Sequence, residues 1–120
     1  MTEQLIDLKQ LLLLIHQNKD FAANFILDEG CTIRSEDPKP LVKVLNYLIN
    51  YLTPLTPAPL EISVDLRGQD VLLSMMAYTE KSDPEPLSDQ VAETLNGYNA
   101  KIDTIHESGK YLQFKISFIR

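Results

Sequence analysis

The alternation of apolar and polar residues in the second half of the chain is the feature that most restricts its fold. In residues 60–66 and again in residues 110–120, alternate side chains are apolar. Successive side chains of a β-strand point to opposite faces, so both segments predict strands with one apolar and one polar face. A sheet built from such strands must have its apolar face covered by other parts of the chain.

Three segments have the apolar spacing of amphipathic helices and can supply that cover. The first is residues 2–19, with Thr2 as its predicted cap. The second begins at Asp37-Pro38 and ends at Thr53-Pro54, and the third runs from Ser88 or Asp89 to Asn96, where Gly97 ends it. The apolar stripes of the first two helices lie at Leu5, Leu8, Leu12 and Ile15, and at Leu41, Val44, Leu45, Leu48, Ile49 and Leu52.

The remaining regular segments are predicted strands. Their ranges are 25–27, 31–33, 60–66, 71–78, 101–106 and 110–120, and polar or glycine-containing turns separate them. The order is helix, two short strands, helix, hairpin, helix, hairpin. This order predicts an α+β fold, a two-layer α/β sandwich with a mostly antiparallel mixed sheet and helices on one face.

Size and charge restrict the classes of function. A chain of 120 residues predicts a single domain over 1–120, in which 1–19 is an N-terminal amphipathic helix and 20–120 is the sandwich. The net charge of −6 argues against a nucleic-acid binder and against attachment to anionic lipid. The longest apolar run, residues 11–15, is too short to cross a membrane. Cys31 is the only cysteine, so we expect a core residue in a cytoplasmic chain without disulfides.

Two stretches resemble the ATP-binding (GHKL-type) domain of sensor histidine kinases. Residues 41–52 are similar to the kinase helix that reads V-L-x-N-L-L-x-N-A, and a hairpin follows as it does in the family. The motifs Asn99-Ala100-Lys101-Ile102, Glu107-Ser108-Gly109-Lys110 and Phe114-Lys115-Ile116-Ser117-Phe118 resemble the family's G-G-x-I, E-x-G-x-G and F-x-F ending. The likeness spans residues 20–119 and implies the kinase ATPase fold.

The residues that bind ATP in that family do not carry over. The resemblance places Tyr47 and Tyr51 where the kinase helix has its asparagines, one of which holds magnesium. Asn46 and Asn50 each come one residue earlier, about 100° around the helix. No aspartate-glycine motif follows the strand that ends at Tyr78. The glycine-rich lid is replaced by residues 79–88, which contain two prolines, and residues 80–93 carry a local charge of −4.

We therefore expect no cofactor and a vestigial pocket. Its candidate residues are Asn46, Tyr47, Asn50, Tyr51 and Tyr78. Large tyrosine side chains in place of asparagines predict that the pocket is filled, and binding of a partner by the tyrosines is the alternative.

Other chemistry has fewer candidates. His16, in the first predicted helix, is the one candidate phospho-acceptor, as in relatives of kinases that transfer phosphoryl groups. His106 beside Glu107 lacks the three or four ligands that a metal site needs, so no metal is expected.

The sequence thus predicts a non-catalytic interaction or regulatory module with a protein partner, for which two-component signalling is the analogy. The stripe Leu5, Leu8, Leu12 and Ile15 is the predicted surface for a homodimer about a two-fold axis. The alternatives are a histidine phosphotransfer protein that uses His16, and a weak or altered nucleotide binder that uses Asn46 or Asn50.

Overall fold

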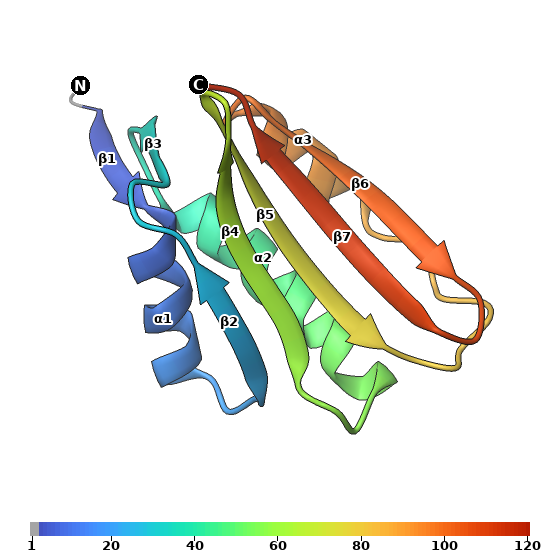
Figure 1. Ribbon diagram of the computed structural model, residues 1–120. Helices are drawn as coiled ribbons and strands as arrows, with labels where there is room; N and C mark the ends of the chain where they lie inside the picture. Colours follow the sequence, from blue (N-terminus) through green and yellow to red (C-terminus); the bar gives the residue numbers. More distant parts are fainter. Residues whose placement is uncertain (1–2) are drawn as a thin grey trace.

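A computed structural model describes residues 3–120 as a mixed five-stranded sheet flanked by helices (Figure 1). The elements are β1 (Gln4–Asp7), α1 (Leu8–Asn18), β2 (Ala23–Leu27), β3 (Thr32–Ser35), α2 (Lys39–Leu52), a 3-10 turn (Thr53–Leu55), β4 (Leu60–Arg67), β5 (Asp70–Tyr78), α3 (Asp89–Asn96), β6 (Ala100–Glu107) and β7 (Tyr111–Phe118). The strand order is β2-β4-β5-β7-β6, and β1 pairs only with β3.

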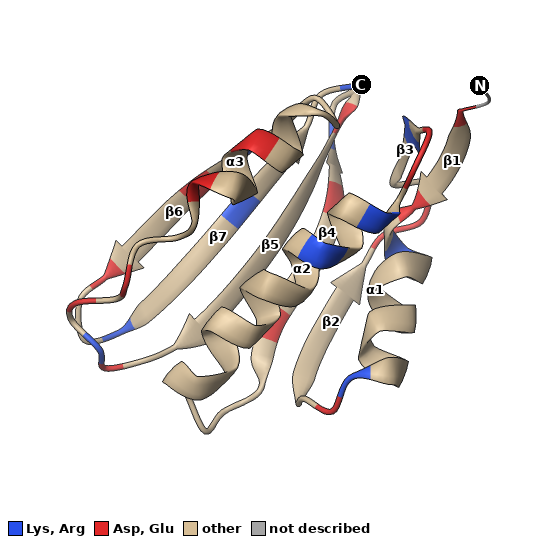
Figure 2. Ribbon diagram, turned by 180° about the vertical axis from the view of Figure 1, so that it is seen from behind, with Lys and Arg blue, Asp and Glu red and all other residues tan. Residues whose placement is uncertain are grey.

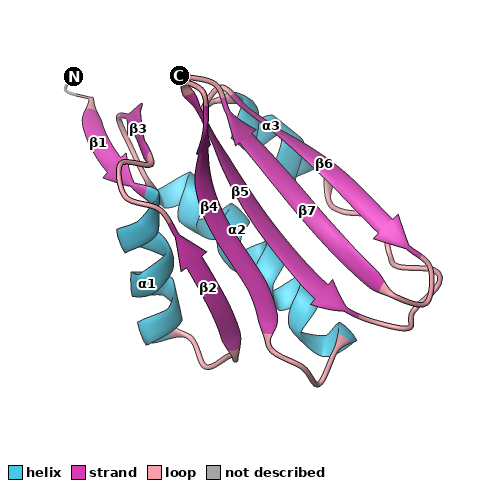
Figure 3. Cartoon of the chain, viewed as in Figure 1, coloured by secondary structure: helices cyan, strands magenta, loops and turns pink. Residues whose placement is uncertain are grey.

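The sheet is mostly antiparallel, as the sequence predicts. β4 and β5 form a hairpin that closes at Arg67 opposite Asp70, and Gly68 provides the positive φ of 64° in its turn. β7 pairs with β5 on one side and with β6 on the other. β2 is the exception, because it runs parallel to β4 at the edge of the sheet (Figure 3).

The apolar core lies between one face of this sheet and the helices. β7 contributes Leu112, Phe114, Ile116 and Phe118, all at most 1% exposed, as its alternation predicts. α2 lies across the middle strands and buries all six residues of its predicted stripe. α3 covers β6 and β7, with Val91 and Leu95 buried, while α1 lies beside β2 (Figure 2). The predicted two-layer α+β sandwich is confirmed.

The prediction of one helix over residues 2–19 is wrong at its beginning. Residues Gln4–Asp7 form β1, which pairs antiparallel with β3, and the helix starts only at Leu8. Asp7 stops the helix from extending backward, because its carboxylate accepts hydrogen bonds from the backbone N–H of Lys9 and Gln10 at 3.0 and 3.3 Å. The cap is therefore Asp7, and the predicted cap Thr2 lies outside the described residues.

The predicted self-association stripe is also corrected. Leu5 lies on β1 and is 60% exposed, whereas Leu8, Leu12 and Ile15 are buried in the core of their own chain. The helical spacing was real, but it marks the side of α1 that faces α2 and the core of the same chain. These three side chains are not available for a second copy.

The segment between the first two helices forms two strands, as expected, but they do not pair with each other. β2 joins the main sheet, and β3 turns away after Gly30 to pair with β1. Cys31 is fully buried at this point, and its carbonyl accepts a hydrogen bond from the N–H of Leu8. Cys31 is thus a core residue, as predicted.

The beginning of α2 is stabilised from two sides. The Asp37 carboxylate accepts a hydrogen bond from the Lys39 N–H at 2.9 Å, although Pro38 occupies the cap position itself. The hydroxyl of Tyr98, which follows α3, accepts from the Leu41 N–H and donates to the Asp37 carbonyl. A distant tyrosine therefore satisfies a backbone donor that the local sequence leaves without a cap.

The position of α1 predicts unequal effects for two leucines of the same helix. Leu12→Ala removes a side chain that is 1% exposed and should lower the free energy of unfolding by about 2–5 kcal/mol. Leu14→Ala, at a site 54% exposed, should lower it by less than about 1 kcal/mol. Urea denaturation followed by circular dichroism measures both. Equal losses would contradict the packing of α1 described above.

Candidate functional site

Two tyrosines on α2 hold the segment between β5 and α3 against the helix. The Tyr47 hydroxyl accepts a hydrogen bond from the Ser88 N–H at 3.0 Å. The Tyr51 hydroxyl donates to the Glu85 carbonyl. Tyr47 and Tyr51 are one helical turn apart, so they project from the same side of α2. The segment 79–88 is therefore fastened to α2 at two points, both near the C-terminal end of the segment.

The other end of this segment is fastened to the sheet. The Nε2 atom of His106, on β6, lies 3.0 Å from the Lys81 carbonyl. The Thr79 hydroxyl accepts from the Lys81 N–H, and the Thr79 N–H donates to the Lys110 carbonyl. A small hollow of about 260 Å³ remains between α2 and α3, beside Lys43, Tyr47 and Val91.

The environment of Tyr51 keeps its phenol neutral. Its ring packs edge-on against Phe114, with 5.5 Å between the ring centroids. Burial is the main cause that raises the pKa of Tyr51 above its ordinary value, and the charge of Glu85 and the neighbouring Tyr47 raise it further. A neutral phenol can donate its hydrogen to the Glu85 carbonyl, so this shift favours the fastened segment.

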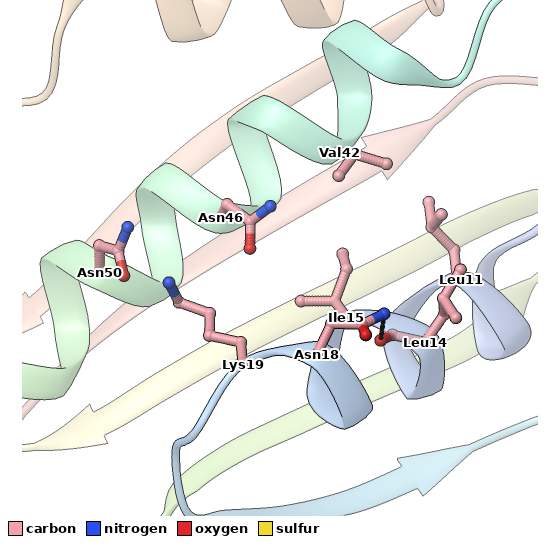
Figure 4. A pocket seen from close by; sticks show the side chains of 8 residues that line it. All are labelled: Leu11, Leu14, Ile15, Asn18, Lys19, Val42, Asn46 and Asn50. Atoms are coloured by element: carbon pink, nitrogen blue, oxygen red, sulfur yellow. Dashed lines mark hydrogen bonds between the residues drawn. The ribbon is translucent and has the colours of Figure 1, made fainter.

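Asn46 and Asn50 do not face the tyrosine side of α2. Both line a groove of about 460 Å³ between α1 and α2, opposite Leu11, Leu14 and Ile15 (Figure 4). The one-residue offset from Tyr47 and Tyr51 thus places the amides on a different side of the helix. Neither asparagine is brought to the segment 79–88.

Tyr78 is separate from the other predicted pocket residues. It ends β5, is 51% exposed, and borders an open depression with Pro54, Glu80 and Lys110. The five predicted pocket residues are therefore divided among three places. Asn46 and Asn50 share the groove beside α1, Tyr47 and Tyr51 share the contact with the 79–88 segment, and Tyr78 lies apart from both pairs.

His16 lies near the end of α1 and packs between two aromatic rings. Its ring centroid is 5.0 Å from that of Phe21 and 5.1 Å from that of Phe25, both in edge-on geometry. Nε2 lies 3.0 Å from the Phe21 carbonyl. A carbonyl only accepts, so Nε2 carries the hydrogen and donates it. This arrangement joins the end of α1 to the beginning of β2.

Other reactive groups are scattered. Burial, the largest cause, raises the pKa of the Cys31 thiol, which is the opposite of what a nucleophile requires. Within residues 3–120, no group of three or more His, Cys, Asp and Glu side chains is arranged to hold a metal ion. No helix in that range is long and apolar enough to cross a bilayer.

Charge is distributed unevenly over the helical side of the molecule. The helices α1 and α2 carry only lysine among charged residues, whereas α3 and the segment before it carry mainly acids (Figure 2). Residues 80–93 contain Glu80, Asp83, Glu85, Asp89 and Glu93 against Lys81, a local charge of −4.

Sequence reasoning missed the role of Arg120. Its guanidinium donates to the carbonyls of Gln69, Gly30 and Thr32, and its N–H donates to the Asp70 carboxylate at 3.2 Å. These contacts join the end of β7 to the β4–β5 turn and to the start of β3. The partners lie 50 to 90 residues away in the sequence, so no local signal could have indicated them.

No protein-family model matches the sequence, and no curated protein is significantly similar to it. Solved structures, however, share its fold. The Acinetobacter baumannii histidine kinase AdeS superposes with a TM-score of 0.76 at 14% identity, covering 98% of this chain and 67% of that chain. The histidine kinase domain of the E. coli osmosensor EnvZ gives a TM-score of 0.76 at 10% identity, covering 98% of this chain and 89% of that one. The catalytic domain of the histidine kinase ThkA gives 0.65 at 14%, with 97% and 95% covered.

These likenesses confirm the fold implied by the sequence resemblance. The chain has the histidine kinase ATPase-like fold over nearly its whole length. Identities this low establish nothing finer than the fold, because one fold supports many functions.

The two tyrosine contacts predict a local loss of protection. Tyr47→Phe and Tyr51→Phe each remove a hydrogen bond to the 79–88 segment and should cost about 0.5–1.5 kcal/mol in the free energy of unfolding. Amide exchange across this segment should become faster, most of all at Ser88 for Tyr47→Phe. Tyr78→Phe is the matched control, because no described residue hydrogen-bonds to its hydroxyl. Unchanged exchange in the first two variants would contradict the fastening.

The raised pKa of Tyr51 predicts a pH dependence of stability. Below pH about 9 the phenol is neutral in both the folded and the unfolded chain, so its contribution is constant. As the pH rises past that value, the unfolded chain loses the proton first and the folded state loses stability. The free energy of unfolding should fall less steeply between pH 9.5 and 11 (roughly the range set by a phenol of pKa about 10) in Tyr51→Phe. Equal slopes would count against a raised pKa of the half-buried Tyr51 phenol.

Proposed function

We propose that this domain is a non-catalytic interaction or regulatory module, built on the histidine kinase ATPase-like fold without its nucleotide site. The observation that carries the proposal is the pair of contacts from Tyr47 to Ser88 and from Tyr51 to Glu85. By the sequence resemblance, these tyrosines stand where the kinase helix has its asparagines. Their side chains reach the segment that replaces the lid.

The chemistry of the 79–88 segment supports the proposal. A phosphate-binding lid requires free backbone N–H groups, which glycine offers and proline lacks. Pro84 and Pro86 remove two of these donors, and the Ser88 N–H is already bound to Tyr47. The local charge of −4 over residues 80–93 would repel a triphosphate.

The positions of the polar residues on α2 support it as well. An altered nucleotide site would need Asn46 or Asn50 to reach ligands near the 79–88 segment. Both side chains instead line the groove on the α1 side of the helix (Figure 4). Phosphotransfer through His16 gains no support either, because Nε2 donates to the Phe21 carbonyl and both flanking rings restrict the imidazole.

An interaction role leaves the partner to be identified. By analogy with proteins of the same fold, a component of two-component signalling is the proposed class of protein partner. The analogy names a class and no individual protein.

Titration with nucleotide tests the proposal. Isothermal titration with Mg-ATP and Mg-ADP should give no heat of binding, and the melting temperature should not change when Mg-ATP is added in large excess. The double variant Tyr47→Ala/Tyr51→Ala, in which the segment is released, serves as a comparison and should also fail to bind, since the glycine-rich lid is absent. Micromolar binding to the unmodified protein would overturn the proposal.

A further inference from the structure

The groove between α1 and α2 is a concave surface that the fold does not use. Its walls are Leu11, Leu14 and Ile15 from α1 and Val42, Asn46 and Asn50 from α2, and its volume is about 460 Å³. Figure 4 shows the two helices on opposite sides of this space, with Lys19 reaching from the end of α1 toward α2. We call this surface the α1–α2 groove.

The floor and one wall of the groove are apolar. Leu14 is 54% exposed, and Leu11 and Val42 are half-buried beside it. An exposed leucine alone needs no explanation, but here it stands at the rim of a hollow in which Leu11 and Val42 are partly open to solvent and Ile15 is buried. The groove thus offers apolar area to a convex ligand.

The opposite wall is a row of one apolar and two amide side chains. Val42, Asn46 and Asn50 are spaced four residues apart, so they follow one line along α2 for about 12 Å. Such a row is matched by side chains at i, i+4 and i+7 of a second helix, which cover about 10.5 Å. The amides supply donors and acceptors that an all-apolar contact would not need.

The charged residues of α1 and α2 indicate which kind of helix the groove would bind. Residues 8–19 and 39–52 contain Lys9, Lys19, Lys39 and Lys43 and no acidic residue, in a chain whose net charge is −6. Lys9 is paired with Glu29, whereas Lys19, Lys39 and Lys43 form no ion pair within residues 3–120. Of these lysines only Lys19 lines the groove, whereas Lys43 lies beside the hollow between α2 and α3. The groove therefore carries one unpaired cation and no acidic side chain, on a molecule that is otherwise acidic (Figure 2).

We propose that the α1–α2 groove binds an acidic amphipathic helix of a protein partner, with apolar side chains against Leu11, Leu14 and Val42 and a carboxylate toward Lys19. This inference rests on the proposed interaction function and names the surface that performs it. The partner's carboxylates raise the association rate and select the partner, and its apolar stripe provides the contact area.

A second copy of the chain fits the groove poorly. Two copies meeting groove to groove would place their lysines against each other. A head-to-tail contact with the acidic α3 would lack an apolar stripe, because Val91 and Leu95 are already buried. A lipid bilayer is flat on this scale and would not enter a hollow between two helices.

Binding of designed helical peptides tests the proposal. The probe is an 18-residue fluorescent alanine-based helix (a length of roughly 27 Å) with leucines at i, i+4 and i+7 and glutamates on the flanks. One control peptide has lysines in place of the glutamates, and another has glutamines in place of the leucines. Fluorescence anisotropy at low salt should give binding to the acidic peptide at least tenfold tighter than to either control, and the affinity should fall as salt is raised.

Matched variants locate the site. Leu14→Glu should weaken binding at least tenfold, and Lys19→Glu should weaken it mainly at low salt. Ile26→Glu changes the net charge as Leu14→Glu does, on an edge strand where the side chain is 72% exposed outside the groove, and should bind as the unmodified protein does. In an NMR titration with the acidic peptide, the chemical shifts of the Asn46 and Asn50 side-chain amide groups should change.

Several results would overturn the proposal. These are equal binding of the acidic and basic helices, no binding of the acidic helix, or binding that Leu14→Glu leaves unchanged. Concentration-dependent dimerisation that Leu14→Glu abolishes would show that a second copy of the chain occupies the groove. Co-sedimentation with phosphatidylserine vesicles would show that the groove binds a membrane instead. Mg-ATP is titrated into the same preparation. A heat of binding for Mg-ATP would overturn the proposed function. No heat with Mg-ATP together with no binding of the acidic peptide would overturn only the proposed role of the groove.

Discussion

Burial of one apolar sheet face under α2 is the interaction on which the rest of this structure depends. The alternating residues of β4, β5 and β7 produce a continuous apolar surface, and the six buried residues of α2 cover its centre. Once α2 is fixed there, the chain that leads into it must cross from the edge strand β2, and α3 must cover the strands that α2 leaves open. The hydrophobic area removed from water sets this arrangement, because it is the largest favourable contribution to folding.

The same helix organises the surface as well as the core. With about 100° of rotation per residue, α2 presents its buried stripe to the sheet, Tyr47 and Tyr51 to the 79–88 segment, and Asn46 and Asn50 to α1. Adjacent residues of α2 therefore have different contacts: Tyr47 and Tyr51 hold the 79–88 segment, whereas Asn46 and Asn50 line the α1–α2 groove. The chain has the histidine kinase ATPase-like fold, and the polar side chains of its central helix contact the 79–88 segment on one side and line the groove on another.

Sequence reasoning succeeded where the signal is local and periodic. The hairpin, the final strand, α2 and α3 all follow from spacing and turn residues, and each is found within a few residues of its predicted range. It failed at residues 4–7, where a helical apolar spacing continues into what is a strand. The hydrogen bonds of β1 to β3 and the Asp7 cap outweigh that spacing, and both depend on residues that the pattern does not reveal. The stripe on α1 shows the same limit, because spacing identifies an apolar side without saying whether it faces the chain's own core or a partner.

The sequence by itself determined the two-layer architecture, because alternation and helical spacing record which side of each element must leave water. It also determined what the 79–88 segment lacks, since glycine and proline set the available backbone donors directly. Only the tertiary structure decided that Tyr47 and Tyr51 hold this segment, that Tyr98 completes the start of α2, and that Arg120 joins the end of β7 to two distant segments. It also decided that a groove lined by Lys19 opens between α1 and α2. Such contacts join residues tens of positions apart, and their geometry exists only after the core has brought those segments together.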